Sequence, residues 1–212
     1  MKQAVIFDMD GVICHTNPYH AEAFRLFFSR YGLKPTEEAF KEHMYGKNNG
    51  YIFSYFLNRP IEGEELAELE REKEACFREL YAPHVQAIAG FLPFLNTLRG
   101  RVALGVATSA PQANMDLILG TLGIRDYFQV ALASEHVRKH KPDPEVYLKA
   151  AAALDVSPAE ALVFEDSFSG VTAARNAGME VIGVLSSHRA EELPPCKDYV
   201  QNYLQLGLGV LS

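Results

Sequence analysis

Short apolar runs, separated by stretches with helical periodicity, are the main pattern of the chain. The first run covers residues 4–7 and ends at an aspartate. An unbroken apolar run of this length is typical of a strand that is buried on both faces of a parallel sheet. Four similar runs predict further strands, at residues 102–107, 130–133, 161–164 and 181–184.

Helical patterns lie between these strands. We predict helices at residues 111–122, 143–154 and 169–177. Pro111 stands at an early helical position, and Gly123 and Gly178 stand where two of the helices are expected to end. The alternation of strand and helix predicts an α/β protein with a Rossmann-like, doubly wound parallel sheet and helices on both faces.

Residues 15–83 break this alternation, because they contain helical patterns and no convincing strand. An amphipathic helix is predicted at 18–31, and a long, highly charged one at 62–81. A helical block of this size is much longer than an ordinary connection between two strands. We therefore predict an inserted helical cap at 15–83, and a catalytic core formed by residues 1–14 and 84–212.

Composition narrows the class of protein. Of the 212 residues, 48% are hydrophobic and 22% are charged, which is ordinary for a soluble globular protein. No apolar stretch is long enough for a membrane helix, and the N-terminal segment lacks a signal-peptide pattern. We expect a cytoplasmic protein, and a monomer. A net charge of −7 without a basic cluster disfavours nucleic acid as a partner.

The three cysteines are far apart and form no Cys-x-x-Cys pair, so the sequence predicts neither a disulfide framework nor a zinc site.

Charged and hydroxyl-bearing residues follow the predicted strands. Asp8 and Asp10 follow the first strand, and other polar residues follow later strands or lie in the loop before residue 143; these are Thr108, Ser109, Lys141, Glu165 and Asp166. In a parallel sheet, ligands bind beyond the carboxyl ends of the strands, so these side chains are expected to meet.

Four carboxylates at one sheet edge would repel one another and raise their pKa values. A divalent cation removes this conflict, and oxygen ligands without Cys or His favour Mg²⁺. Asp8, Asp10, Glu165 and Asp166 are therefore the candidate metal ligands. Lys141 and the Thr108–Ser109 pair can hold a phosphate group, because positive charge, hydroxyls and backbone N–H groups stabilise the oxygens in phosphoryl transfer.

The sequence Asp8-Met9-Asp10-Gly11-Val12, followed in order by Thr108, Lys141 and Glu165-Asp166, resembles the signature of the haloacid dehalogenase superfamily. The resemblance covers almost the whole chain. A cap directly after the first motif is similar to the beta-phosphoglucomutase-like phosphatase branch. All the pieces in one order are much more specific than the first motif alone.

The resemblance implies a role for each residue. Asp8 would attack phosphorus and form an aspartyl-phosphate. Asp10 would act as general acid and then as general base, with its backbone carbonyl facing the metal. Asp166 would bind Mg²⁺ directly, and Glu165 directly or through water. Thr108 and Lys141 would hold the phosphoryl group.

In the cap, the resemblance points to His20, Lys47 and Lys73 as substrate contacts. Each also has a simpler explanation, as polar surface, part of a glycine-bounded turn, or one charge on a solvated helix face. Two positions depart from the mutase pattern: Asn49 stands where that pattern has an arginine for the distal phosphate, and His15 replaces an acid.

The sequence thus predicts a Mg²⁺-dependent phosphatase of small phosphorylated metabolites, most simply sugar phosphates. The alternative is a beta-phosphoglucomutase, which returns the phosphoryl group to a sugar. Asp10 and Glu165-Asp166 argue against a dehalogenase, which needs the first aspartate but no metal. Asp10 also argues against a phosphonate hydrolase, which would use a cap lysine as a Schiff base and usually lacks the second aspartate. A non-catalytic binding module is disfavoured because every catalytic position is filled.

Overall fold

A computed structural model of the chain describes residues 1–44 and 49–212, apart from the side chain of Lys41. Two compact units form the chain: residues 1–15 together with 85–212, and residues 16–84. The larger unit contains the whole sheet and the smaller one consists of helices. Lys47 lies outside the described residues.

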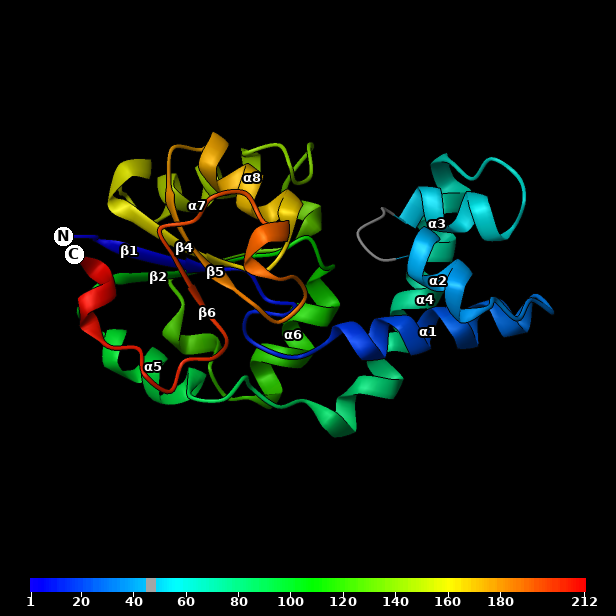
Figure 1. The fold of residues 1–212 in the computed structure, drawn as a ribbon, viewed down its shortest axis with the longest axis horizontal. Helices are drawn as coiled ribbons and strands as arrows, with labels where there is room; N and C mark the ends of the chain where they lie inside the picture. Colours follow the sequence, from blue (N-terminus) through cyan, green and yellow to red (C-terminus); the bar gives the residue numbers. More distant parts are fainter. Residues whose placement is uncertain (45–48) are drawn as a thin grey trace. The chain divides into compact units, whose positions relative to one another are not determined.

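The sheet is parallel and has six strands in the order β3-β2-β1-β4-β5-β6 (Figure 1). The strands are β1 (Ala4–Phe7), β2 (Ala103–Ala107), β3 (Val130–Leu132), β4 (Ala161–Glu165), β5 (Glu180–Val184) and β6 (Asp198–Val200). Strands β2 and β3 lie on one side of β1, and strands β4 to β6 lie on its other side. The ends of β1 and β4 therefore form the switch point, where open α/β sheets bind their ligands. The predicted fold class is confirmed.

Both faces of β1 are buried, which explains its uninterrupted apolar sequence. Phe7 packs on one face against aromatic rings from α5 (Phe91–Leu98) and β4, including Phe91, at a ring distance of 5.3 Å, and Phe164, at 5.0 Å. Ala4 and Ile6 point to the other face, where they join the core formed with α7 (Glu145–Ala153) and α8 (Phe168–Asn176). In Figure 1, α7 and α8 lie above the sheet and α5 lies below it.

The helical unit is built from α1 (Asn17–Arg30), α2 (Glu37–His43), α3 (Asn49–Phe56) and α4 (Gly63–Tyr81). Its core is a cluster dominated by phenylalanines, among them Phe24, Phe27, Phe28, Phe40 and Phe53. Helix α2 begins at an N-cap, where the hydroxyl of Thr36 accepts a hydrogen bond from the backbone N–H of Ala39. Within the described part of the chain, no helix is both long and apolar enough to cross a membrane.

The three helices predicted after β2, β3 and β4 are present as α6 (Gln112–Thr121), α7 and α8, with shifts of one or two residues at their ends. Four elements carried no recognisable pattern: α2, α3, α5 and β6. Helix α5 contains Pro93, which is tolerated because it stands in the first turn, where a backbone N–H has no partner within the helix. Strand β6 has only three residues at the sheet edge, too few for a visible alternation.

Candidate active site

Asp8 directly follows β1, and β4 holds its backbone in place. Its backbone N–H donates to the carbonyl of Phe164 at 3.0 Å, which continues the ladder between β1 and β4. A tight turn follows, in which the carbonyl of Met9 accepts from the N–H of Ile13 at 2.8 Å. Gly11 in this turn has φ +73°, and a Cβ there would lie 1.9 Å from Oδ2 of Asp166. Only glycine fits, because the turn needs a positive φ and Asp166 occupies the side-chain space.

Lys141 connects the loop before α7 with the ends of β1 and β4. Its Nζ lies 2.7 Å from Oδ1 of Asp8, 2.7 Å from Oε1 of Glu165 and 3.0 Å from the hydroxyl of Tyr147. Burial alone would lower the pKa of Lys141, but the carboxylates of Asp8 and Glu165 outweigh it and hold that pKa well above its usual value. The side chain is therefore a buried, permanent cation beside Asp8.

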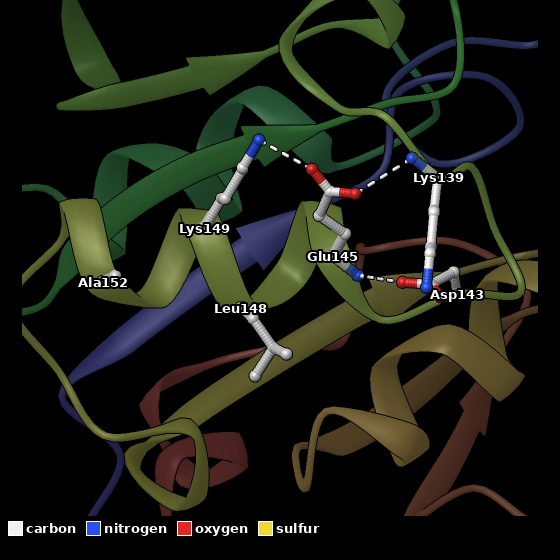
Figure 2. Close-up of a pocket in the computed structure, with 6 residues that line it drawn as sticks. All are labelled: Lys139, Asp143, Glu145, Leu148, Lys149 and Ala152. Atoms are coloured by element: carbon white, nitrogen blue, oxygen red, sulfur yellow. Dashed lines mark hydrogen bonds and ion pairs between the residues drawn. The ribbon is translucent and has the colours of Figure 1, made fainter.

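Glu145 holds the backbone of the loop that contains Lys141. Its carboxylate accepts hydrogen bonds from the backbone N–H groups of Arg138, at 3.1 Å, and Lys139, at 2.9 Å. It also pairs with Lys149 at 2.7 Å, and Figure 2 shows the contacts of Glu145 with Lys139 and Lys149. The bond from Lys149, followed by the two backbone N–H groups, lowers the pKa of Glu145 to about 2. Lys139, Glu145 and Lys149 are among the residues that line a surface groove of about 460 Å³, and the Glu145 carboxylate positions the chain just before Lys141.

Glu165 is almost completely buried, and both of its oxygens accept hydrogen bonds. Oε1 accepts from Lys141 and, at 3.0 Å, from Tyr147. Oε2 accepts from the backbone N–H groups of Asp166, at 2.8 Å, and Ser167, at 2.9 Å, and from the Ser167 hydroxyl. A Cβ at Gly170 would overlap the same carboxylate. Glu165 thus joins the first turn of α8 to Lys141, and a cation would have to share its oxygens with protein donors.

Asp166 differs from Glu165 in that one of its oxygens accepts no hydrogen bond from residues 1–44 and 49–212. Oδ2 accepts from the hydroxyls of Ser186, at 3.1 Å, and Ser187. Oδ1 has no such donor. Burial, and then the nearby charge of Glu165, raise the pKa of Asp166 to about 7.

A divalent cation fits this site. Asp8, Glu165 and Asp166 each offer an oxygen, and these oxygens lie within 4.8 Å of one another. Burial is also the largest reason why the pKa of Asp8 is well above its usual value; Lys141 lowers it, and the three nearby acids raise it further. Because these buried carboxylates repel one another, they cannot all be ionised without a nearby positive charge, and a bound cation would supply that charge. A set of oxygen ligands suits a hard divalent cation.

The structure brings most of the predicted site residues to this edge of the sheet. Thr108 is buried at the end of β2, and its hydroxyl oxygen accepts from the N–H of Ala110 at 3.0 Å. The hydroxyl proton has no acceptor among the described residues, so it can be donated to a ligand. Ser109 beside it is exposed. Asp10 is half-buried, and its charge is among the causes that raise the pKa values of Asp8 and Asp166.

In the helical unit, two of the predicted residues form one cluster. Nζ of Lys73 lies 3.0 Å from Nδ1 of His20 and 2.6 Å from Oε1 of Glu74. The His20 ring stacks on Phe77 at 3.8 Å. Because an ammonium group can only donate, Nδ1 of His20 accepts, and the neutral ring carries its proton on Nε2. Lys73 is 3% exposed, so its interpretation as part of a solvated helix face is wrong.

Sequence reasoning missed Tyr147, Glu74 and the pair Ser186 and Ser187. Tyr147 looked like one more apolar position of a helix, although its hydroxyl joins Lys141 to Glu165. The two serines follow β5, and their place after a predicted strand was the only available signal. Glu74 was hidden among the other charges of α4.

The family model for haloacid dehalogenase-like hydrolases matches residues 5–184. The chain therefore belongs to this family and is an enzyme, and the predicted resemblance is confirmed.

Two curated relatives and one solved structure are similar to the chain over most of its length. The chain is 36% identical over 192 residues to a phosphorylated carbohydrates phosphatase from Thermotoga maritima, covering 87% of the chain and 86% of the relative. It is 32% identical over 180 residues to the fructose-1-phosphate phosphatase YqaB from Escherichia coli, covering 85% and 95%. A crystal structure of beta-phosphoglucomutase from Clostridium difficile has a TM-score of 0.83 and 26% identity, and the match covers 100% of this chain and 96% of that one.

Proposed function

We propose that this enzyme hydrolyses phosphate monoesters of small sugars, with Asp8 as the nucleophile and Mg²⁺ as the cofactor. One observation carries the proposal. Oδ1 of Asp8 is fixed by Lys141 at 2.7 Å, whereas Oδ2 accepts no hydrogen bond from the part of the chain that the structure describes. A carboxylate with one oxygen anchored and the other available, beside a candidate metal site, is suited to attack phosphorus.

In the first step, Oδ2 of Asp8 forms a bond to phosphorus while the bond from phosphorus to the sugar oxygen breaks. Asp10 donates a proton to the leaving oxygen, so the sugar departs as an alcohol. Lys141 and the hydroxyl of Thr108 hold the oxygens of the phosphoryl group during the transfer. Ser109 adds a second hydroxyl at the end of β2.

In the second step, water attacks phosphorus and Asp10 takes its proton, which releases inorganic phosphate and restores the carboxylate of Asp8. Asp8, the backbone carbonyl of Asp10 and Asp166 would hold Mg²⁺, which supplies positive charge to the phosphoryl oxygens when bound. Glu165 would support this set indirectly, because its oxygens already accept hydrogen bonds from Lys141, Tyr147 and α8.

The choice of sugar phosphates rests on the names of the two relatives and on the cap. We assign substrate contacts to His20 and Lys73, and also to Lys47, which lies outside the described residues. The Nε2–H group of His20 is a suitable donor to a sugar hydroxyl or a phosphate oxygen. Glu74 neutralises Lys73, and Asn49 lacks the two-pronged cation of an arginine, so the described part of the cap favours a monophosphate over a bisphosphate.

The test is turnover of a panel of sugar monophosphates, including fructose 1-phosphate, together with p-nitrophenyl phosphate, each with Mg²⁺ and with EDTA. We expect release of inorganic phosphate from several sugar phosphates and its loss in EDTA. Full activity in EDTA, or no phosphate release from any ester, would contradict the proposal.

A beta-phosphoglucomutase is the second candidate, favoured by the hydrogen bond between His20 and Lys73 and by the structural likeness to such a mutase. Incubation with beta-glucose 1-phosphate, Mg²⁺ and a trace of glucose 1,6-bisphosphate separates the two. Rapid formation of glucose 6-phosphate with little free phosphate would identify a mutase. We expect mainly inorganic phosphate.

A further inference from the structure

The loop after β5 places two hydroxyls and one imidazole on Asp166. Ser186 and Ser187 both contact Oδ2 of Asp166, the first at 3.1 Å. Nδ1 of His188 lies 3.0 Å from the backbone carbonyl of the same aspartate. A carbonyl oxygen only accepts, so Nδ1 of His188 must carry the proton of this bond. Residues 186–188, called the serine loop below, thus hold Asp166 by its side chain and by its main chain.

Ser186 and Ser187 donate their hydroxyl protons mainly to different acceptors. The hydroxyl of Ser186 lies 2.5 Å from the carbonyl of Gly11 and 3.1 Å from Asp166, and both of these partners are acceptors. One hydroxyl has a single proton, so Ser186 gives it mainly to the nearer Gly11 and links the turn after Asp8 to the serine loop. Ser187 is then the main donor to Asp166.

Together these contacts enclose one oxygen of Asp166. The site of a Cβ on Gly11 lies 1.9 Å from Oδ2 of Asp166 and 2.8 Å from Oγ of Ser186, so Oδ2 lies against the turn with no free space on that side. Oδ1, by contrast, receives no hydrogen bond within the described ranges. The carboxylate is therefore anchored through Oδ2, which leaves Oδ1 for a ligand. Asp166 forms one oxygen cluster with Asp8 and Glu165.

We propose that the serine loop positions Asp166 for the divalent cation and thereby sets the affinity of the enzyme for Mg²⁺. This inference rests on the proposed Mg²⁺-dependent function. Ser186, Ser187 and His188 are positioning residues and would not contact the cation themselves. Without Ser187, the Asp166 carboxylate can rotate about its Cβ–Cγ bond, and cation binding must then also restrict this rotation. Groups that orient metal ligands typically change metal affinity by about 10–100-fold.

The test is calorimetric titration of EDTA-stripped enzyme with Mg²⁺, without substrate. We expect the Kd for Mg²⁺ to rise about 10-fold or more in Ser187→Ala, and to stay near the wild-type value in Ser187→Thr, which keeps the hydroxyl. Ser134→Ala is the matched control, because the Ser134 hydroxyl also donates to a carboxylate, that of Glu135 at 3.0 Å, but outside the site. It should leave the Kd unchanged.

A second readout separates positioning from a general structural effect. The kcat of Ser187→Ala should approach the wild-type value at saturating Mg²⁺, because the nucleophile and the acid are intact. Ser187 is exposed, so this variant is expected to fold; Ser186→Ala, which also frees the Gly11 turn, should weaken Mg²⁺ binding and lower the melting temperature as well. A Kd in Ser187→Ala within two-fold of wild type would overturn the inference. Wild-type enzyme that does not bind Mg²⁺ would instead overturn the metal-dependent function on which it rests.

Discussion

Nζ of Lys141 lies 2.7 Å from Oδ1 of Asp8, although 133 positions of sequence separate the two residues. Both side chains are less than one-tenth exposed, so this is a buried ion pair, and Glu165 extends it to a second carboxylate at 2.7 Å. The other oxygen of Asp8 accepts no hydrogen bond from residues 1–44 and 49–212, and Lys141 supplies the positive charge that a phosphoryl group would meet.

We expect Lys141→Met to abolish measurable phosphatase activity and to destabilise the enzyme. Breaking a buried ion pair by removing one partner leaves uncompensated charge, at a cost of about 3–5 kcal/mol in the free energy of unfolding. Lys139→Met is the matched control, because Lys139 belongs to the same loop, is 74% exposed and pairs with Asp143 only at 3.7 Å. Urea unfolding and steady-state kinetics check both variants; equal losses in the two would contradict the assigned role.

Asp10→Ala is expected to reduce kcat by about 10²–10⁴-fold, the usual contribution of a positioned acid or base. The Mg²⁺ affinity should change little, since the backbone carbonyl of residue 10 remains. Steady-state kinetics at several Mg²⁺ concentrations separate the two effects. A large loss of metal affinity with an unchanged single-turnover rate would show that Asp10 serves the metal and not proton transfer.

Asp166→Asn should weaken Mg²⁺ binding by more than about 100-fold, whereas Glu165→Gln should weaken it by about 10–100-fold, the range for groups that act on a metal through its ligands. The reason is that the oxygens of Glu165 already accept hydrogen bonds from protein donors, whereas Oδ1 of Asp166 accepts none from the described residues. Glu165→Gln should in turn cause the larger fall in melting temperature, because it disturbs Lys141, Tyr147 and the start of α8. The reverse order of metal affinities would exclude Asp166 as the direct ligand.

The metal-free enzyme should lose stability as pH rises from about 4 to 7. The pKa of Asp166 is raised to about 7 in the folded protein, mainly by burial, whereas an aspartate in the unfolded chain titrates near about 3.9. The folded state therefore holds a proton that the unfolded state has released, and the free energy of unfolding decreases through this window.

Melting temperatures in EDTA across this pH range check the prediction. Asp166→Asn should flatten the pH profile, and added Mg²⁺ should restore stability near neutral pH because it binds the ionised carboxylates. An EDTA profile that rises with pH over the same range, unchanged by Asp166→Asn, would contradict it.

The core of the site could be predicted from sequence because it follows one rule of parallel sheets. Asp8, Thr108 and Glu165-Asp166 each stand at a strand end, so the fold brings them together once the strands are recognised. The orientation of the carboxylates could not be predicted in this way. It depends on partners such as Tyr147 and Ser187, which lie 18 and 21 positions from the acids they contact and belong to no local pattern.

The same limit applies to the fold and to the cap. Strand β6 is defined by pairing with β5 and not by its own three residues. Lys73 looked solvated because it stands among charged residues of α4, but it is buried against His20, Glu74 and the ring of Phe24. A pattern of charged residues along a helix shows which side chains are ionisable, but packing in three dimensions decides which of them are buried.

The configuration at phosphorus after hydrolysis reports whether the phosphoryl group passes through Asp8. The measurement is the hydrolysis, in isotopically labelled water, of a substrate ester whose thiophosphate group is chiral through oxygen isotopes. Attack by Asp8 followed by attack of water makes two in-line displacements, each inverting phosphorus. We expect net retention of configuration in the thiophosphate released by the wild-type enzyme, and no release by Asp8→Asn. Net inversion would contradict it, because water would then have displaced the sugar in a single step.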